Sequence, residues 1–277
     1  MTPVEAMELA RRGNLMPYVI AICHQKGGVA KTTTAISLGA SFARLGLKTL
    51  LIDLDPQANL TSGVGLDSNE ISYSIAEVLM GEVDLATTRA ETSLPGLNII
   101  PSNDAMLTIN RQLYQMPEYE YRLRRVLQAA AVQDYQVVLL DCPPSVGPLT
   151  FNALTAADLL IIPTQCEFFS IQALTDMFEL IRLIRKRTNP ELAYRLLVTM
   201  FDRRGTFHTR MLEQMRTYFD VGLLNTIIGF DTKLREAQLT GTPVLVHAPN
   251  SRGAQQYQQL AEELNVYVTK QSQVQTA

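Results

Sequence analysis

The chain has 277 residues, and 24 basic against 27 acidic side chains give it a formal net charge of −3. Because 47% of the residues are hydrophobic, the chain can bury a large core, which excludes global disorder. The mild negative charge excludes a uniformly basic protein, but it leaves room for a local basic surface.

Short apolar segments alternate with stretches of helical periodicity along most of the chain. The predicted strands are Tyr18–Cys23, Thr49–Asp53, Leu97–Ile100, Val137–Asp141, Leu159–Pro163, Arg195–Met200 and Asn225–Ile228. Helical spacing runs from Thr32 to Gly46, from about Ile171 to Arg187, and over Gly253–Leu264. This alternation predicts an α/β fold, a mostly parallel sheet with helices on both faces. In such folds, ligands bind at the C-terminal ends of the strands.

No linker divides the chain into two domains. We expect a short N-terminal extension over residues 1–17, a single domain over residues 18–268, and a flexible polar tail over residues 269–277. We expect this extension to be too short for a helix-turn-helix domain. The apolar runs fall far short of the roughly 18–20 residues of a membrane-spanning helix, and a secretory signal is absent, so we expect a cytoplasmic protein.

The first informative motif follows the first predicted strand, where residues 24–33 read HQKGGVAKTT. Glycines let successive backbone N–H groups point at an anion, and the following helix N-terminus favours negative charge. Lys31 is placed to reach terminal phosphates, and the Thr32 hydroxyl to bind Mg²⁺. Gln25 and Ala30 occupy the two glycine positions of the strict pattern GxxxxGK[ST]. The alternative interpretation is a glycine turn before a threonine-capped helix.

Three aspartates stand at predicted strand ends. Asp53 and Asp55 end the second strand, and Asp141 ends the strand that begins at Val137. One such aspartate can be a simple turn or helix cap. Three of them at the edge that carries the lysine-bearing loop indicate a nucleotide site with a metal ion.

On these residues the sequence resembles the ParA/Soj/MinD family of P-loop ATPases, which have a deviant Walker A motif. The resemblance runs from about Tyr18 to Leu264. Residues 26–33 resemble the family's KGGVGKTT, and DLDPQANLTSG at 53–63 resembles DxDPQGNxTSG. Further similar segments are DCPPS at 141–145, QCEFF at 165–169 (QCEYY in the family), MFDR at 200–203 and SRGA at 251–254.

The resemblance implies roles for these residues, with ATP and Mg²⁺ as cofactors. Lys26 would be the signature lysine that crosses a dimer interface to the partner's ATP, although a solvated loop lysine is the alternative. Lys31 would hold phosphates, Asp55 would orient the attacking water, and Thr32 would bind the metal with Asp53 and Asp141 nearby. The expected nucleotide contacts are Gly27, Gly28, Val29, Ala30, Lys31, Thr32, Thr33, Met200, Asp202 and Pro249.

Ala30 departs from the family pattern. Its methyl group could crowd the phosphates or require a negative φ at this position, which puts affinity and hydrolysis rate in question. Because alanine is the smallest possible intrusion, we expect ATP binding to survive.

Basic residues concentrate in one segment. Residues 181–216 hold nine basic and three acidic side chains, a net charge of +6 that leaves −9 for the rest of the chain. A basic face on DNA phosphates and a solvated helix end at Arg182–Arg187 are the two interpretations. The candidate DNA-binding residues are Arg185, Arg187, Arg203, Arg204, Arg210, Lys233, Arg235 and Arg252. Residues 228–238 read IGFDTKLREAQ where the family has IPRNxRLSEAP, so Phe230 replaces a basic residue.

The predicted function is an ATPase that dimerises on binding ATP, binds double-stranded DNA without sequence specificity, and segregates or positions DNA or another large cargo. A ParB-like or cargo-adaptor partner would stimulate its hydrolysis, and the protein would associate with the nucleoid. Two alternatives are a MinD-like ATPase that cycles on membranes and a nucleotide-gated DNA scaffold with negligible hydrolysis. The end of the chain carries a single lysine after Leu264, which argues against the membrane cycle.

The three cysteines, Cys23, Cys142 and Cys166, have neither disulfide nor zinc spacing. An iron–sulfur cluster between subunits is the alternative use of Cys142 and Cys166. We expect buried structural thiols at all three positions.

Overall fold

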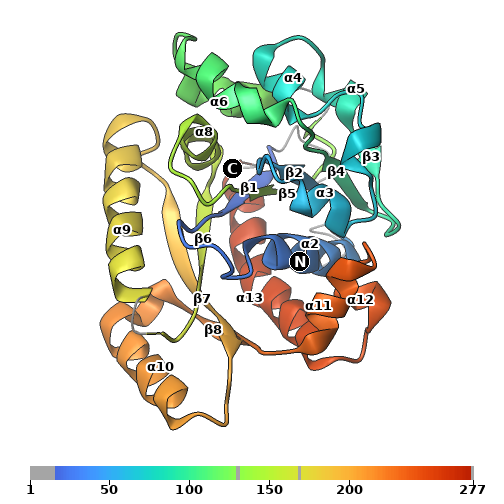
Figure 1. The fold of residues 1–277 in the computed structure, drawn as a ribbon. Coiled ribbons are helices and arrows are strands. Elements are labelled where there is room, and N and C mark those ends of the chain that lie inside the picture. The colour runs from blue at the N-terminus through green and yellow to red at the C-terminus, as the bar shows by residue number, and fades with distance from the viewer. Residues whose placement is uncertain (1–15, 129–131, 168–169, 276–277) are drawn as a thin grey trace.

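The computed structural model describes residues 16–128, 132–167 and 170–275, and in these residues eight strands form one sheet (Figure 1). They are β1 (Tyr18–Ile22), β2 (Thr49–Asp53), β3 (Ala90–Glu91), β4 (Leu97–Ile100), β5 (Val137–Asp141), β6 (Leu159–Thr164), β7 (Ala193–Phe201) and β8 (Leu223–Gly229). Their spatial order is β3-β4-β2-β5-β1-β6-β7-β8. The pair β3 and β4 is antiparallel, and the other paired strands are parallel.

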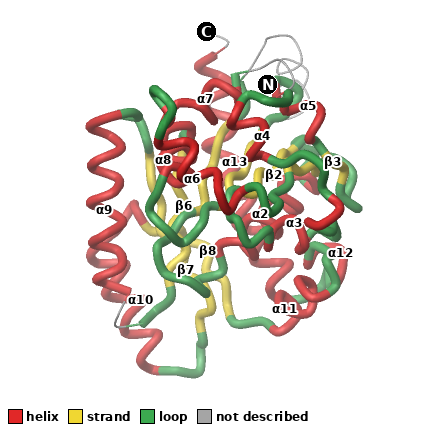
Figure 2. Tube along the Cα trace, turned by 45° about the horizontal axis from the view of Figure 1, so that its top comes forward, coloured by secondary structure: helices red, strands yellow, loops and turns green. Residues whose placement is uncertain are grey.

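Helices cover both faces of this sheet. One face carries α4 (Ile75–Met80), α5 (Leu85–Thr88), α6 (Met106–Tyr114), α7 (Arg122–Leu127), α8 (Pro148–Ala156) and α9 (Ser170–Arg187). The other carries α2 (Lys31–Arg44), α3 (Asn59–Gly63), α11 (Thr232–Leu239), α12 (Val244–His247) and α13 (Arg252–Gln275), while α10 (Thr206–Phe219) packs near the end of β7. Figure 1 and Figure 2 both show α9 on the opposite side of the molecule from α11 and α12.

The central strands are apolar throughout because both of their faces are covered. Every residue of β1, β2 and β5 is buried. In β1, Tyr18, Ile20 and Ile22 pack on the face with α2 and α13, while Val19 and Ala21 pack on the face with α8 and α9. Such continuous apolar runs are typical of buried parallel strands. The predicted α/β fold with a mostly parallel sheet is confirmed.

The elements differ from the predictions at the edges of the fold. The two-residue strand β3 was not predicted, since a pair of residues carries no periodicity. In the structure α13 continues through residues 269–275, where neither proline nor glycine interrupts the helix, and the flexibility expected of this tail stays a prediction. Residues 1–15 of the expected N-terminal extension, and residues 276–277 of the tail, lie outside the described residues.

The topology brings the C-terminal ends of three strands together. The central strand β1 lies between β5 and β6, and Ile22 at its end pairs with Asp141 at the end of β5. Asp141 in turn pairs with Asp53 at the end of β2. The loops after β1, β2 and β5 therefore begin side by side, at the edge where α/β sheets bind their ligands.

Candidate functional site

The loop after β1 curls around the Lys31 ammonium at the N-terminus of α2. The backbone N–H of Lys26 donates to Nδ1 of the buried His24 at 2.8 Å, which curls the loop back on itself. The Lys31 ammonium lies inside the curl, 3.4 Å from the carbonyl oxygen of Lys26. At Gly27 and at Gly28 an added Cβ would meet no atom within 4 Å, so the loop leaves open space there. A lysine and a helix N-terminus that face open space are suited to binding an anion.

Ala30 takes a glycine-like conformation in this loop. Its φ is 67° and its ψ is 34°, in the left-handed region, immediately before the first residue of α2. The alanine therefore does not force a negative φ on the loop, which was one of the two expected consequences. The strain of a left-handed alanine, about 1–2 kcal/mol, is instead carried by the folded protein.

The strand-end aspartates lie against this loop. Oδ2 of Asp141 accepts a hydrogen bond from the Thr32 hydroxyl at 2.6 Å. Asp53 is fully buried, and its carboxylate accepts from the N–H of Asp55 at 3.1 Å and from the N–H and hydroxyl of Thr61 at 2.9 and 2.7 Å. The structure thus brings together Thr32, Asp53 and Asp141, the three predicted metal-site residues.

Burial strongly affects the charge of these carboxyl groups. It raises the pKa of Asp53 to about 6, against the opposing effect of the hydrogen bonds from Thr61 and Asp55. Burial and the neighbouring Asp53 carboxylate hold the pKa of Asp141 well above its ordinary value. Two adjacent buried carboxyl groups of this kind favour a cation beside them.

The residues present fit a hydrated Mg²⁺ ion. The second carboxylate oxygen of Asp141, Oδ1, is buried and has no hydrogen-bond partner. The described residues hold no cluster of three or more His, Cys, Asp or Glu side chains suited to a metal. Mg²⁺ does not need such a cluster, because it keeps several waters and uses one or two protein oxygens together with phosphate oxygens. Thr32 and Asp141 offer these oxygens, while those of Asp53 are already hydrogen-bonded within the protein.

Two residues that the sequence did not indicate hold the acidic loop in place. The Thr61 hydroxyl, which donates to Asp53, accepts from the N–H of Ser102 at 2.9 Å. The hydroxyl of the buried Ser102 donates to the backbone carbonyl of Asp55 at 2.8 Å. Thr61 lies within the DLDPQANLTSG segment, whose resemblance could have indicated it. Ser102 follows β4 and carried no signal of its own.

The predicted signature lysine contacts its own chain. The Lys26 ammonium lies 2.6 Å from a carboxylate oxygen of Glu167 and 3.3 Å from the side-chain oxygen of Gln165. Gln165 also donates to the carbonyl of Gly28 at 3.1 Å. The segment 165–167 therefore borders the phosphate loop. The next two residues of the QCEFF motif, Phe168 and Phe169, lie outside the described residues.

A pocket of about 90 Å³ opens beside the start of α2. Its lining residues are Ala30, Thr33, Thr199, Met200, Ile228, Gly229, Phe230, Asp231, Leu234, Arg235, Gln238 and Tyr257. Met200, a predicted nucleotide contact, lines it. Asp202 and Pro249, which were also predicted, do not; the Asp202 carboxylate instead accepts two hydrogen bonds from the Arg204 guanidinium, at 3.0 and 2.9 Å.

The structure separates the predicted basic residues into two groups. Arg185 and Arg187 end α9, next to the start of β7 at Ala193. Arg203 and Arg204 follow the other end of β7, and α10 with Arg210, α11 with Lys233 and Arg235, and α13 with Arg252 begin on the same side of the sheet. The nine residues of β7 put about 30 Å between the two groups. Figure 1 shows the end of α9 and the start of α10 at opposite ends of β7. The segment is therefore not one basic face.

The three cysteines are buried free thiols. A contact with the Cys23 thiol, together with burial, holds the pKa of Cys142 well above its ordinary value. Burial raises the pKa of Cys166 to about 11. The thiol in contact with that of Cys142 is thus Cys23, which directly follows the neighbouring strand β1.

Comparison with known proteins agrees with this geometry. A family model described as an AAA domain matches residues 17–194. The sporulation initiation inhibitor protein Soj of Bacillus subtilis is 37% identical over 250 residues, which cover 90% of this chain and 98% of Soj. The chromosome partitioning protein ParA of Caulobacter vibrioides is 39% identical over 248 residues, which cover 89% of this chain and 93% of ParA.

A solved structure supports the same assignment. Cobyrinic acid a,c-diamide synthase from Mycobacterium smegmatis, crystallised with an ATP analog and magnesium, superposes with a TM-score of 0.80 at 33% identity, covering 91% of this chain and 95% of that chain. In the described residues no helix is both long and apolar enough to cross a membrane. The strand-end aspartates, the lysine-bearing loop and the extent of these matches agree, and the chain belongs to the ParA/Soj-type P-loop ATPases.

Proposed function

We propose that this chain is a Mg²⁺-dependent ATPase that dimerises when it binds ATP, binds double-stranded DNA without sequence specificity, and moves or positions DNA or another large cargo. The observation that carries the proposal is the contact between the Thr32 hydroxyl and the Asp141 carboxylate, 2.6 Å apart and next to the loop that encloses the Lys31 ammonium. This arrangement supports a nucleotide with its metal ion at the edge of the sheet.

Each residue of the site has a separate role in binding or hydrolysing ATP. Lys31 and the N–H groups at the start of α2 bind the phosphates, and Thr32 with Asp141 holds Mg²⁺, which supplies charge neutralisation when bound. Asp55, two residues after the end of β2 and almost fully buried, orients the attacking water. The pocket beside Ala30 and Met200 takes the nucleoside. Because the Lys26 side chain is 33% exposed, it can reach a second subunit, where it stabilises charge in the transition state.

Nucleotide binding and turnover test this proposal directly. Titration calorimetry with ATP and Mg²⁺ is expected to give saturable binding, and an absence of heat would overturn the central assignment. Turnover measured with and without DNA separates a hydrolysing enzyme from a DNA scaffold with negligible hydrolysis.

The cargo and the activating partner are tested with a trapped complex. Asp55→Ala is expected to keep ATP affinity while lowering hydrolysis by roughly 10²–10⁴-fold, because the positioned acceptor for the attacking water is removed. Such a variant stays in its ATP-bound form, so a pull-down with it enriches a ParB-like or cargo-adaptor partner. Wild-type turnover in Asp55→Ala would remove Asp55 from the mechanism.

A further inference from the structure

Gln238 lies in the last turn of α11, at a position that the surrounding backbone fixes. The helix ends with Gly241 in the left-handed conformation, at a φ of 61°. The N–H of Gly241 donates to the carbonyl of Gln238 at 3.2 Å, and that of Thr242 to the carbonyl of Ala237 at 3.1 Å. This pair of bonds is the Schellman motif. A Cβ at Gly241 would lie 2.9 Å from Cα of Gly65, so this helix end rests against the loop that follows α3.

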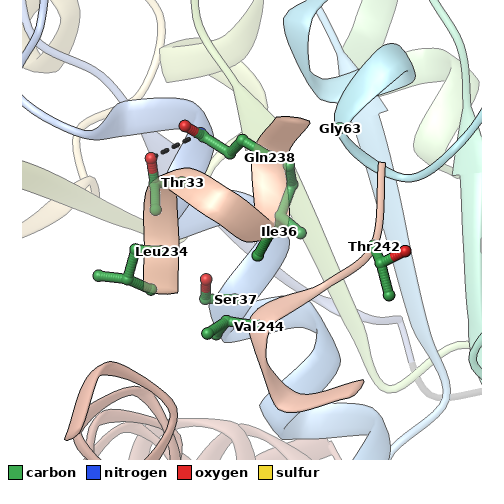
Figure 3. Close-up of a pocket in the computed structure, with 9 residues that line it drawn as sticks. Thr33, Ile36, Ser37, Gly63, Leu234, Gln238, Thr242 and Val244 are labelled. Atoms are coloured by element: carbon green, nitrogen blue, oxygen red, sulfur yellow. Dashed lines mark hydrogen bonds between the residues drawn. The ribbon is translucent and has the colours of Figure 1, made fainter. Parts of the chain in front are cut away.

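From this position the Gln238 side chain reaches the phosphate-loop helix. Its Nε2 donates to the Thr33 hydroxyl oxygen at 2.7 Å, across 205 residues of sequence. Figure 3 shows the two side chains pointing toward one another, with Leu234, Ile36 and Val244 around the small pocket between α11 and α2. Gln238 also lines the larger pocket next to Ala30, so it stands between the two.

The direction of this hydrogen bond determines what the Thr33 hydroxyl can do. An amide NH₂ group only donates, so the Thr33 oxygen accepts and its own proton stays available. A threonine in a helix often donates that proton to the carbonyl four residues earlier. Here that carbonyl, of Val29, already accepts a hydrogen bond from the Thr199 hydroxyl at 3.1 Å. Within the described residues, the Thr33 hydroxyl donates to no protein acceptor.

The free proton lies where an anion is expected. Thr33 is in the first turn of α2, whose N–H groups face the open side of the phosphate loop. A phosphate oxygen in this loop would be an acceptor for the Thr33 hydroxyl.

We propose that Gln238 is a positioning residue for the nucleotide's phosphate chain: its amide holds the Thr33 hydroxyl so that the hydroxyl proton points at a phosphate oxygen. The inference rests on the proposed function, since it takes a nucleotide in the phosphate loop as given. It also gives α11 a direct contact with the nucleotide site, although this helix comes after the last strand of the sheet in the sequence.

The test compares variants that change the direction of this bond. Gln238→Glu replaces the donor by a carboxylate, which accepts the Thr33 proton itself and withdraws it from the phosphate. We expect its affinity for a non-hydrolysable ATP analogue with Mg²⁺ to fall about tenfold or more in titration calorimetry. Leu239→Glu is the matched control. It adds the same charge at the next residue of the chain, where the side chain is 89% exposed. This control is expected to bind like the wild type.

A double-mutant cycle separates positioning from a merely structural role. Gln238→Met keeps the side-chain length without a donor, and we expect it to lower affinity about threefold in the wild type. In a Thr33→Val background, where no hydroxyl remains, the same substitution is expected to change nothing. Full wild-type affinity in Gln238→Glu, or an undiminished effect of Gln238→Met in the Thr33→Val background, would overturn the inference. Failure of the wild type to bind the analogue would count against the proposed function instead.

Discussion

The Lys26 ammonium and the Glu167 carboxylate form an ion pair of 2.6 Å within one chain. The lysine proposed to act on a partner's nucleotide therefore contacts its own subunit in the monomer. The two side chains are 33% and 49% exposed. Exposed ion pairs of this kind contribute at most about 1 kcal/mol to stability. In a dimer, the phosphate oxygens of the partner's nucleotide can therefore replace Glu167 as the acceptor for Lys26.

Replacing this lysine is expected to remove catalysis and to leave ATP binding intact. Lys26→Ala should lower partner-stimulated turnover by about 10³-fold, the contribution of a cation supplied to the transition state by another subunit. Phosphate-release assays measure turnover, and calorimetry measures ATP affinity. Lys48→Ala serves as the control. It removes an exposed lysine just before β2, at the N-terminal ends of the strands and away from the phosphate loop. An active Lys26→Ala would mean that the lysine is only a solvated loop residue.

The left-handed conformation of Ala30 predicts the direction in which a glycine at this position changes the free energy of unfolding. Ala30→Gly relieves the strain at a φ of 67° but raises the conformational entropy of the unfolded chain. We expect a net gain in stability of about 0.5–1 kcal/mol. Denaturant unfolding with an unchanged m-value is the measurement. Ala43→Gly, inside α2, is the control and should destabilise by a similar amount, as glycine does within a helix. If both substitutions destabilise the protein, strain at Ala30 is refuted.

The buried histidine of the phosphate loop predicts a dependence of stability on pH. Burial, followed by the nearby charges of Lys31 and Lys26, lowers the pKa of His24 from 6.5 to about 4. The unfolded chain therefore binds a proton that the folded loop rejects, and stability falls as the pH drops from 6.5 to about 4. The loss amounts to at most about 3 kcal/mol.

The matched variant for this effect is His24→Asn, which keeps an acceptor for the Lys26 N–H but does not titrate. Urea unfolding at pH 7 and at pH 4.5 should show a smaller acid-induced loss in the variant than in the wild type. Equal losses in both proteins would mean that His24 does not contribute to acid sensitivity.

The separation of the basic residues predicts which of them bind DNA. Charge reversal of Arg203 and Arg204, on the side of the sheet that carries the nucleotide site, should abolish ATP-dependent binding to arbitrary duplex DNA in a low-salt gel shift. Reversal of Lys186 and Arg187, at the far end of β7, changes the charge equally and should leave binding nearly intact. Removing one cation that neutralises a DNA phosphate should make the plot of log affinity against log salt shallower by about 0.9. The opposite ranking would move the DNA surface to the end of α9.

Much of the fold was predictable because the sequence signals are local. The central strands are short apolar runs that end at Asp53 and Asp141, and the glycines of the phosphate loop stand between a strand and a helix. The chemistry of the site follows from these neighbours in sequence, and its resemblance to a known family rests on the same residues.

What the sequence could not predict depends on distant contacts or on backbone conformation. Nothing in the residues around Gln238 points to Thr33, because the contact exists only once the end of α11 is fixed against the loop after α3. The left-handed φ of Ala30 is imposed by the loop against the preference of alanine. The net charge of residues 181–216 combines two groups of arginines that lie apart in space, because β7 runs the length of the sheet between them.

The order of the strands also bears on how the molecule opens. The phosphate loop is attached to β1, which is paired on both sides, whereas the pocket beside it is lined in part by residues at the end of β8 and just after it, and β8 is one of the two edge strands. Edge strands exchange their amide protons through small openings, while a central strand such as β1 opens only when the whole domain unfolds. A ligand that contacts both would link an edge strand of the sheet to its central strand, and slower exchange of the β8 amides in the presence of the ligand would show that link.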